Sequence, residues 1–398
     1  MSSWFVAVTA GRWQRYGIQQ ARELGFKIIA IDTDPNAEGL RDADHIINKP
    51  LSDVDGIIEE LASLEGDIKG AVSFVSDAGV MLAAVIRDRF NLPGERPEVC
   101  GRMVNKAIQR SLWKHNGVPS PNFCVVTTKE GALSKIESFG FPLIIKPSDS
   151  SGSRGVTKLE SASDDIGDAI SRAFQFTRTS QVLIESFMEG NEFTVESFLA
   201  DGKHYLLAIT EKKKVEGTRG TVASELATPE RPPEVLQRIS QAVISAYDAL
   251  QYRNGPGHAE VILMHDGSVG LVEVAGRGGG FLVFDKLIPA VSGINIARIT
   301  AMQAVGIKLG TIDPISRSAV LRFFPSRHGI LTGMQGFDSA NLLEGVEAGP
   351  FASLGDRFSQ ATVDGDRLGY ILSQGDTPSL AQLRADTAES LISFEISP

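Results

Sequence analysis

Short apolar runs and amphipathic segments alternate along the first quarter of the chain. The pattern predicts strands at 5–8, 27–32 and 71–75 and helices at 14–24 and 79–89. Strands that alternate with helices are typical of a parallel sheet with helices on its faces. The first turn, Thr9–Gln14, lacks the glycines of a dinucleotide-binding fingerprint, so NAD binding is not expected.

A stretch rich in proline and glycine at 91–97 separates this region from a different pattern. The second region predicts helices at 104–115 and 233–250 and strands at 142–146, 181–187, 192–199 and 203–210. Asp201-Gly202 turns the last two strands into a hairpin, so this region is antiparallel or mixed. From about residue 306, strands at 318–324 and 368–373 and a helix at 379–392 predict a small α+β domain.

A second hairpin carries two glutamates. Asp266-Gly267, between two apolar runs, predicts a two-residue type I′ turn that places Ile262 opposite Leu271 and Glu260 opposite Glu273. Directly opposed Cβ atoms lie about 4.5–5.5 Å apart, where like charges are destabilising. Hard divalent cations such as Mg²⁺ take carboxylate and phosphate oxygens as ligands. The pair is therefore a candidate metal site; solvated glutamates, or a bulge that breaks the register, are the alternative.

Composition limits the class of protein. The 398 residues are 42% hydrophobic and 22% charged, which is ordinary for a soluble protein of two or three domains. The net charge of −10 argues against nucleic acid or an anionic membrane as a partner. Cys100 and Cys124 form no metal or redox motif, which fits a reducing cytoplasm. No window approaches the roughly 20 apolar residues of a membrane span.

A lysine and a loop of small residues follow one another. Lys146 ends a predicted buried strand, where an ammonium group is costly unless it meets an anion. The loop Ser150–Val156 contains serines, glycines and Arg154, and such loops let backbone N–H groups approach phosphates. A merely flexible loop is the alternative.

The order of these pieces resembles the ATP-grasp superfamily of carboxylate–amine ligases. It runs from Lys106 through Lys146 and its loop, Glu185-Ser186-Phe187-Met188 and Glu192 to Glu260 and Glu273-Val274-Ala275-Gly276-Arg277. The resemblance covers nearly the whole chain and is greatest to the L-amino-acid (dipeptide) ligases. It implies an α/β and α+β fold with a parallel pre-grasp domain at 1–95, an ATP-grasp domain of two subdomains at 96–305 with a hinge near 185–188, and a small C-terminal α+β domain at 306–398.

The resemblance also implies roles for individual residues. Two lysines and the small-residue loop would hold ATP phosphates, the hinge would offer backbone groups to adenine, and Glu192 would take the ribose hydroxyls. Glu260 and Glu273 would bind Mg²⁺, with Mn²⁺ as an alternative. The expected ATP-binding residues are Lys106, Lys146, Ser150, Ser151, Gly152, Ser153, Gly155, Val156, Glu185, Ser186, Phe187, Met188 and Glu192.

Arg277 is the candidate catalytic residue, because a guanidinium suits an acyl phosphate or a tetrahedral oxyanion. A salt bridge to one of the two glutamates is the alternative. His258, Gly278, Gly279 and Gly280 are candidate substrate residues, although His258 could equally be a satisfied core histidine. Ala275 stands where many superfamily members have an asparagine ligand. Lys212–Lys214 are expected in a mobile loop over the site, with a merely solvated run as the alternative. Which of them, or Arg219, meets phosphate is left open.

The expected reaction is ADP-forming ligation, in which a carboxylate is activated as an acyl phosphate and attacked by an amine. Both substrates would be small molecules, one of them an amino acid, in a cytoplasmic enzyme that forms a homodimer like others of its group. Activation of bicarbonate through carboxyphosphate is the alternative within the fold. A non-catalytic ATP-binding module is disfavoured because Lys106, Lys146, Glu260 and Glu273 are all present.

Overall fold

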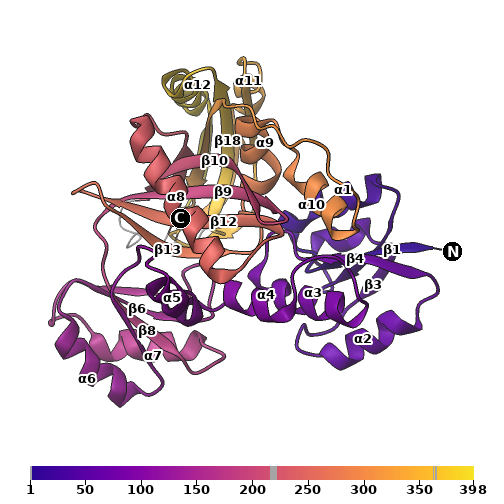
Figure 1. Cartoon of the computed structure of the whole chain (residues 1–398). Coiled ribbons are helices and arrows are strands. Elements are labelled where there is room, and N and C mark those ends of the chain that lie inside the picture. The colour runs from indigo at the N-terminus through magenta and orange to yellow at the C-terminus, as the bar shows by residue number, and fades with distance from the viewer. Residues whose placement is uncertain (1, 216–221, 362, 364) are drawn as a thin grey trace.

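The structure is a computed structural model that describes residues 2–215, 222–361, 363 and 365–398 (Figure 1). Its N-terminal part is a parallel sheet in the strand order β3-β2-β1-β4. The elements of this part are β1 (Ser3–Val8), η1 (Arg12–Gln14), α1 (Arg15–Glu23), β2 (Lys27–Ile31), η2 (Glu38–Asp42), β3 (His45–Ile47), α2 (Val54–Ser63), β4 (Asp67–Val72) and α3 (Asp77–Arg89).

The central strand of this sheet is apolar because both of its faces are covered. Phe5 and Ala7 of β1 face a core shared with α1, whereas Val6 and Val8 face a core shared with α2 and α3. The predicted parallel α/β arrangement is confirmed. The strand expected at 71–75 lies earlier, as β4, because exposed charged residues in its first half hide that part from a search for apolar runs.

A second sheet, in the order β5-β8-β6-β7, lies at the lower left of Figure 1 and packs against α6 and α7. The elements here are α4 (Pro97–Met103), α5 (Lys106–His115), β5 (Phe123–Val126), α6 (Lys129–Phe139), β6 (Leu143–Pro147), β7 (Thr157–Leu159), α7 (Ile166–Phe176) and β8 (Val182–Ser186). The start of α5 is set by Asn105, whose side chain accepts hydrogen bonds from the amides of Ala107 and Ile108.

Among the described residues, the longest sheet is antiparallel and has eight strands in the order β13-β12-β9-β10-β11-β14-β18-β16. Helix α8 covers one face of β9, β12 and β13, and Val195, Val261 and Val274 pack there against Tyr247. The elements are β9 (Gly190–Ala200), β10 (Lys203–Lys214), β11 (Ala223–Ala227), α8 (Pro233–Leu250), β12 (Gly255–Met264), β13 (Val269–Ala275), η3 (Val283–Leu287), α9 (Ile288–Ser292), α10 (Ile296–Ala304), β14 (Ser318–Pro325), β16 (Val346–Pro350), β18 (Arg367–Gly375) and α12 (Pro378–Leu391).

The C-terminal region continues this sheet, because β14 pairs with β11 and then with β18. A smaller sheet, β17-β15-β19, lies beside it. Its strands and the neighbouring helix are β15 (Gly329–Gln335), α11 (Phe337–Ala340), β17 (Arg357–Phe358) and β19 (Ser393–Ser397). The domain boundaries at 95/96 and 305/306 stay predictions. The second boundary separates β13 from β14 in the chain, although both strands belong to the same eight-stranded sheet.

The carboxylate hairpin has the predicted pairing of Glu260 with Glu273, but its turn differs from the prediction. The amide of Met264 donates to the Ser268 carbonyl and that of Gly267 to the Met264 carbonyl, so the loop has three residues and Gly267 takes a φ of 81°. Ile262 consequently faces Gly270 rather than Leu271. A bulge after Leu271 then shifts the register back by one residue, so the two errors cancel at the glutamates.

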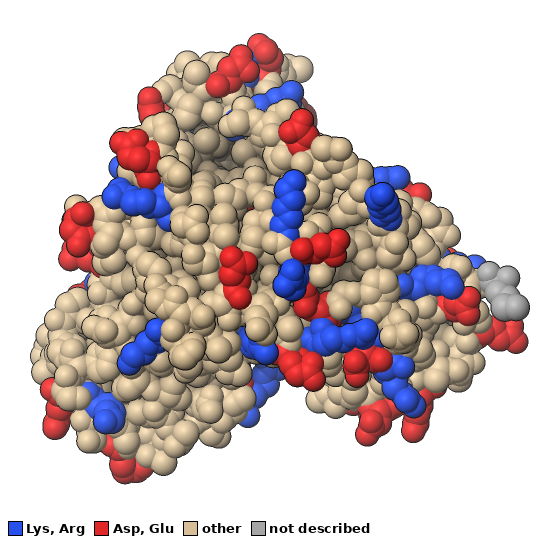
Figure 2. Space-filling view, viewed as in Figure 1, with Lys and Arg blue, Asp and Glu red and all other residues tan. Residues whose placement is uncertain are grey.

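Acidic and basic side chains are interspersed over the face of the molecule that Figure 2 shows. No helix within the described ranges is long and apolar enough to cross a membrane.

Candidate active site

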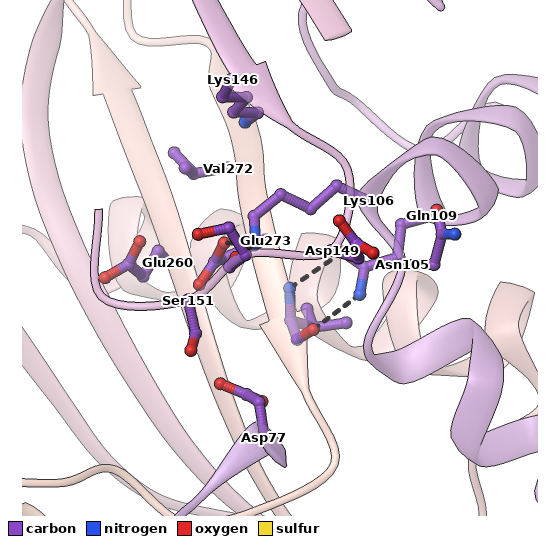
Figure 3. Close-up of polar contacts among 12 residues, drawn as sticks. Asp77, Asn105, Lys106, Gln109, Lys146, Asp149, Ser151, Glu260, Val272 and Glu273 are labelled. Atoms are coloured by element: carbon purple, nitrogen blue, oxygen red, sulfur yellow. Dashed lines mark hydrogen bonds and ion pairs between the residues drawn. The ribbon is translucent and has the colours of Figure 1, made fainter. Parts of the chain in front are cut away.

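The predicted phosphate and metal residues come together from different sheets. In Figure 3, Lys106 reaches from the start of α5 to Glu273, with Glu260 on the neighbouring strand. Lys106 Nζ lies 2.8 Å from Glu273 Oε2 and donates to the Ser150 carbonyl at 2.8 Å. Burial alone would raise the pKa of Glu273, but the Lys106 ammonium outweighs it and lowers that pKa to about 2. Glu273 is therefore an ionised carboxylate held beside a cation.

The anion beside Lys146 is the side-chain carboxylate of Glu185. Lys146 Nζ lies 2.7 Å from Glu185 Oε2, and Arg110 Nε lies 2.8 Å from Glu185 Oε1, all three side chains being buried. Burial lowers the pKa of Lys146 more than Glu185 raises it. The resemblance to the superfamily implied a role for the backbone of Glu185 alone. The side chain of Glu185 holds Lys146, the predicted phosphate-binding lysine, in place.

The lysine run lies in strand β10, so the expectation of a mobile loop at Lys212–Lys214 was wrong. Lys212 Nζ bridges Glu192 Oε1 at 2.5 Å and Glu260 Oε1 at 2.6 Å, and Lys214 Nζ lies 2.5 Å from Glu192 Oε2. Lys213 points to the opposite face and pairs with Glu225. Strand alternation thus selects Lys212 and Lys214 as the site lysines.

Arg219, the fourth candidate for the phosphate contact, lies outside the described residues.

For Glu192, burial favours the neutral acid, but Lys212 and Lys214 lower its pKa to about 2. The ribose candidate is therefore a carboxylate that already has two ammonium partners.

The loop between β6 and β7 has the form that phosphate binding requires. Gly152, Ser153 and Gly155 all have positive φ, and Ser150 Oγ donates to the Arg154 carbonyl. The backbone amides of 151–155 have no hydrogen-bond acceptor among the described residues. A Cβ at residue 155 would lie 2.9 Å from Pro147 Cγ, so the glycine there is a steric requirement.

The hinge residues have fewer free backbone groups than expected. The amide of Ser186 donates to the Asn122 carbonyl and that of Phe187 to the Pro142 carbonyl. The amide of Met188 has no acceptor in the described part of the chain. Lys158 Nζ lies 3.8 Å from the centroid of the Phe187 ring. The free amide at Met188 is therefore the donor left for a base.

Arg277 forms a salt bridge, but not with either of the glutamates considered from the sequence. Its Nη2 lies 2.7 Å from Asp77 Oδ2 and its Nη1 donates to the Gly278 carbonyl at 2.9 Å. Burial opposes the charge, but Asp77 raises the pKa of Arg277. Sequence reasoning missed Asp77, which begins α3 two hundred positions earlier.

His258 and the glycine run lie next to Arg277. His258 Nδ1 is 2.6 Å from Oε1 of Glu196, a fully buried residue of β9 that sequence reasoning also missed. Burial lowers the pKa of His258, but Glu196 raises it by more. A Cβ at residue 278 would lie 1.9 Å from Phe284 Cδ2, whereas one at residue 280 would meet nothing within 4 Å.

The donor set at the hairpin fits a hard divalent cation. Glu260 and Glu273 are paired across β12 and β13, and each carboxylate also contacts a lysine. The described residues contain no group of three or more His, Cys, Asp or Glu side chains placed to hold a metal. Two carboxylates leave coordination positions for phosphate oxygens and water, which is how Mg²⁺ commonly binds at nucleotide sites.

Comparison with protein families identifies two domains in the chain. Residues 139–285 match the ATP-grasp domain, and residues 322–397 match the L-amino acid ligase C-terminal domain 2. The chain thus contains an ATP-grasp domain followed by a C-terminal domain of the L-amino acid ligase type. ATP-grasp enzymes use ATP and a divalent metal ion.

Two curated proteins are similar to the chain at low sequence identity. The uncharacterized protein y4rH of Sinorhizobium fredii is 26% identical, over 96% of this chain and 80% of its own length. Alanine–anticapsin ligase of Bacillus subtilis is 25% identical, over 69% of this chain and 61% of its own length. The chain thus spans about three fifths of that ligase.

Solved structures share the fold. An L-amino acid ligase from Bacillus licheniformis superimposes with a TM-score of 0.83 at 19% identity, covering 100% of this chain and 99% of its own. N5-carboxyaminoimidazole ribonucleotide synthetase from Thermotoga maritima gives 0.73 at 17% identity, with both chains fully covered.

Proposed function

We propose that this protein is an ADP-forming ligase that joins the carboxylate of an amino acid to an amine. The observation that carries the proposal is the convergence of Glu260, Glu273, Lys106 and Lys212 beside a loop with free backbone amides. Carboxylates, ammonium groups and amides in one place are what a metal-bound nucleoside triphosphate requires. The L-amino acid ligase C-terminal domain favours an amino acid among the carboxylate substrates.

The reaction transfers the γ-phosphoryl group and then the acyl group. A substrate carboxylate oxygen forms a bond to the γ-phosphorus while the bond to the bridging oxygen of ADP breaks. The amine then attacks the acyl carbon, the bond to phosphate breaks, and the amine loses a proton. No protein nucleophile is needed, so positioning and electrostatics account for catalysis.

Each step has residues that suit it. We assign the phosphates to Lys106, Lys146 and the 150–156 loop, and the metal to Glu260 and Glu273. When bound, the metal supplies charge neutralisation at the transferring phosphoryl group. We assign to Arg277, which Asp77 holds, the stabilisation of the negative charge that develops on the acyl oxygen. Glu192 remains the candidate for the ribose hydroxyls and Met188 for the base.

Three finer points belong to the same proposal. We assign Mg²⁺ as the metal, with Mn²⁺ as a substitute, because all the protein ligands are carboxylate oxygens. A cytoplasmic location fits consumption of ATP and two free cysteines. A homodimer is the expected assembly, and light scattering on the purified chain would test it.

The test is ADP and phosphate release with pairwise mixtures of amino acids and small acids. Glu273→Gln should lower turnover at least about 100-fold, because the neutral amide loses the charge with which this residue would hold a divalent cation, whose charge neutralisation contributes several kcal/mol. Glu234→Gln, the same change at an exposed position of α8, should leave turnover unchanged.

Three outcomes would contradict parts of the proposal. ADP release that bicarbonate stimulates with no amino acid present would favour the carboxylase alternative. Near-normal turnover by Glu273→Gln would refute the metal assignment. ATP binding with no ADP formed from any acid and amine would point to a non-catalytic module.

A further inference from the structure

A second charged cluster lies on the same face of the large sheet as the two candidate metal ligands. His258 precedes Glu260 by two residues along β12, and Glu196 faces His258 from β9. Two residues along a strand advance about 6.6–6.8 Å. The second cluster therefore lies roughly 7 Å from the metal ligands, on the side toward Arg277.

Of the two carboxylate oxygens of Glu196, one has a hydrogen-bond partner among the described residues. The residue is fully buried, and its Oε1 pairs with His258 Nδ1. Its Oε2 is buried and has no hydrogen-bond partner among the described residues. A buried carboxylate oxygen without a donor costs free energy. The free oxygen thus marks a position for a donor that the described side chains do not supply.

Glu196 is closely packed on its sides toward the glycine run and the core. A Cβ at residue 279 would lie 3.2 Å from Glu196 Oε1 and 2.7 Å from Val283 Cγ1, so a glycine is needed there. Beyond Glu196 the strand continues into apolar core at Phe198. Arg277 Nε is also buried without a partner in the described chain, so the cluster has one free acceptor and one free donor.

We propose, on the basis of the proposed ligase function, that Glu196 binds the ammonium group of the carboxylate substrate and so selects acids with a neighbouring free amino group. In an α-amino acid one carbon separates the two charged groups. With one hydrogen bond of about 2.7–3.2 Å from its ammonium group to Glu196, such a substrate extends from this cluster toward the candidate metal and phosphate groups. Its carboxylate then lies toward Glu260 and Glu273 while its ammonium meets Glu196.

A competing explanation is that Glu196 only holds the ring of His258 in place. That role would affect every acid substrate equally, since it does not depend on an amino group. Selection by charge predicts instead an effect confined to ammonium-bearing acids. The two explanations therefore differ in a ratio of rates rather than in the overall rate.

The experiment compares the best amino acid with the same acid lacking its amino group, using hydroxylamine as a common acceptor and measuring ADP and hydroxamate. The unaltered enzyme should prefer the amino acid at least about 10-fold in kcat/KM, the size of a charge-assisted hydrogen bond. Glu196→Gln keeps the shape and should lose that preference through a raised KM for the amino acid. Its kcat/KM with the des-amino acid should fall much less than that with the amino acid, so that the ratio of the two collapses, whereas all parameters of Glu234→Gln should be unchanged.

A test on the unaltered enzyme does not depend on how the variant folds. The N-acetyl derivative of the same amino acid lacks the charge and should react at least about 10-fold more slowly than the free amino acid. Equal use of charged and uncharged acids, or an equal loss on both in Glu196→Gln, would overturn the inference. Absence of ADP with every acid would instead refute the ligase function itself.

Discussion

Lysines and glutamates in the nucleotide site are paired with one another. Lys106 contacts Glu273, and Lys212 joins Glu192 to Glu260. Buried carboxylates are stable only with such partners, because desolvation otherwise favours the neutral acid. A bound phosphate would replace the carboxylates as partner of the lysines, and a bound divalent cation would replace the lysines as partner of the carboxylates. Binding would therefore leave no charge unpaired. The paired charges of this candidate site therefore suit the metal nucleotide that we propose it binds.

The pKa of Glu192 predicts how stability depends on pH. Its value of about 2 in the folded protein lies below the ordinary value near 4.3. A carboxyl group with a depressed pKa stabilises the fold above its unfolded pKa and loses that contribution as pH falls toward the folded one. The free energy of unfolding should therefore decrease from about pH 5 downward, as measured by denaturant titration.

Glu192→Gln should flatten this dependence, because the amide does not titrate. Glu234→Gln, at an exposed position, should keep the slope of the unaltered protein. An identical slope in Glu192→Gln would show that other carboxylates account for the acid sensitivity.

The glycine run links the site to helix η3. A Cβ at residue 278 would lie 1.9 Å from the Phe284 ring, so Gly278→Ala must displace the run and with it the neighbouring Arg277. We expect a loss of about 1–3 kcal/mol in the free energy of unfolding together with reduced turnover. Thermal unfolding and ADP release would measure the two effects.

Gly280→Ala is the matched control two residues away. A Cβ there would meet nothing within 4 Å, and Gly280 has no positive φ. Stability near that of the unaltered protein is expected. Equal damage from both substitutions would mean that flexibility of the run, rather than its packing on η3, is what matters.

At the scale of elements, the carboxylate hairpin was predicted correctly only in part. The apolar runs and Asp266-Gly267 were enough to predict two paired strands, and the pairing of Glu260 with Glu273 was correct. The three-residue loop was not predicted, although its hydrogen bonds from Ser268 to Asp266 are local. The bulge after Leu271, which the sequence left open as an alternative, depends on tertiary contacts. One of these contacts is the hydrogen bond from Arg110 to the Val272 carbonyl, 162 residues apart in sequence.

Asp77, which was not predicted from the sequence, is also brought into the site by a tertiary contact. Asp77 meets Arg277 only because the N-terminal sheet packs beside the glycine run, where Gly278 donates to the Phe74 carbonyl. No spacing rule connects positions so far apart. Glu196 did leave a signal, since Glu192, Thr194 and Glu196 alternate along one strand and share the face of the site.

At the scale of the whole molecule, the large sheet joins the ATP-grasp region to the C-terminal region. Ala227 pairs with Val320 across β11 and β14, and Arg322 binds the buried carboxylate of Glu225. Arg322 also contacts Asp386 and Glu389 of α12. The C-terminal residues thus cover a strand edge and neutralise a buried charge of the preceding domain.

A chain that ends at residue 305 should therefore not fold as an independent ATP-grasp protein. It would expose the edge of β11 as an unpaired strand and remove Arg322 from Glu225, which leaves edge hydrogen-bonding groups open to aggregation. Size-exclusion chromatography and denaturant unfolding of residues 1–305 should show aggregation or a non-cooperative transition, beside a cooperative one for the full chain. A monomeric 1–305 fragment that unfolds cooperatively and binds ATP would instead make the C-terminal region a separable module, with the continuous sheet incidental to the stability of the nucleotide site.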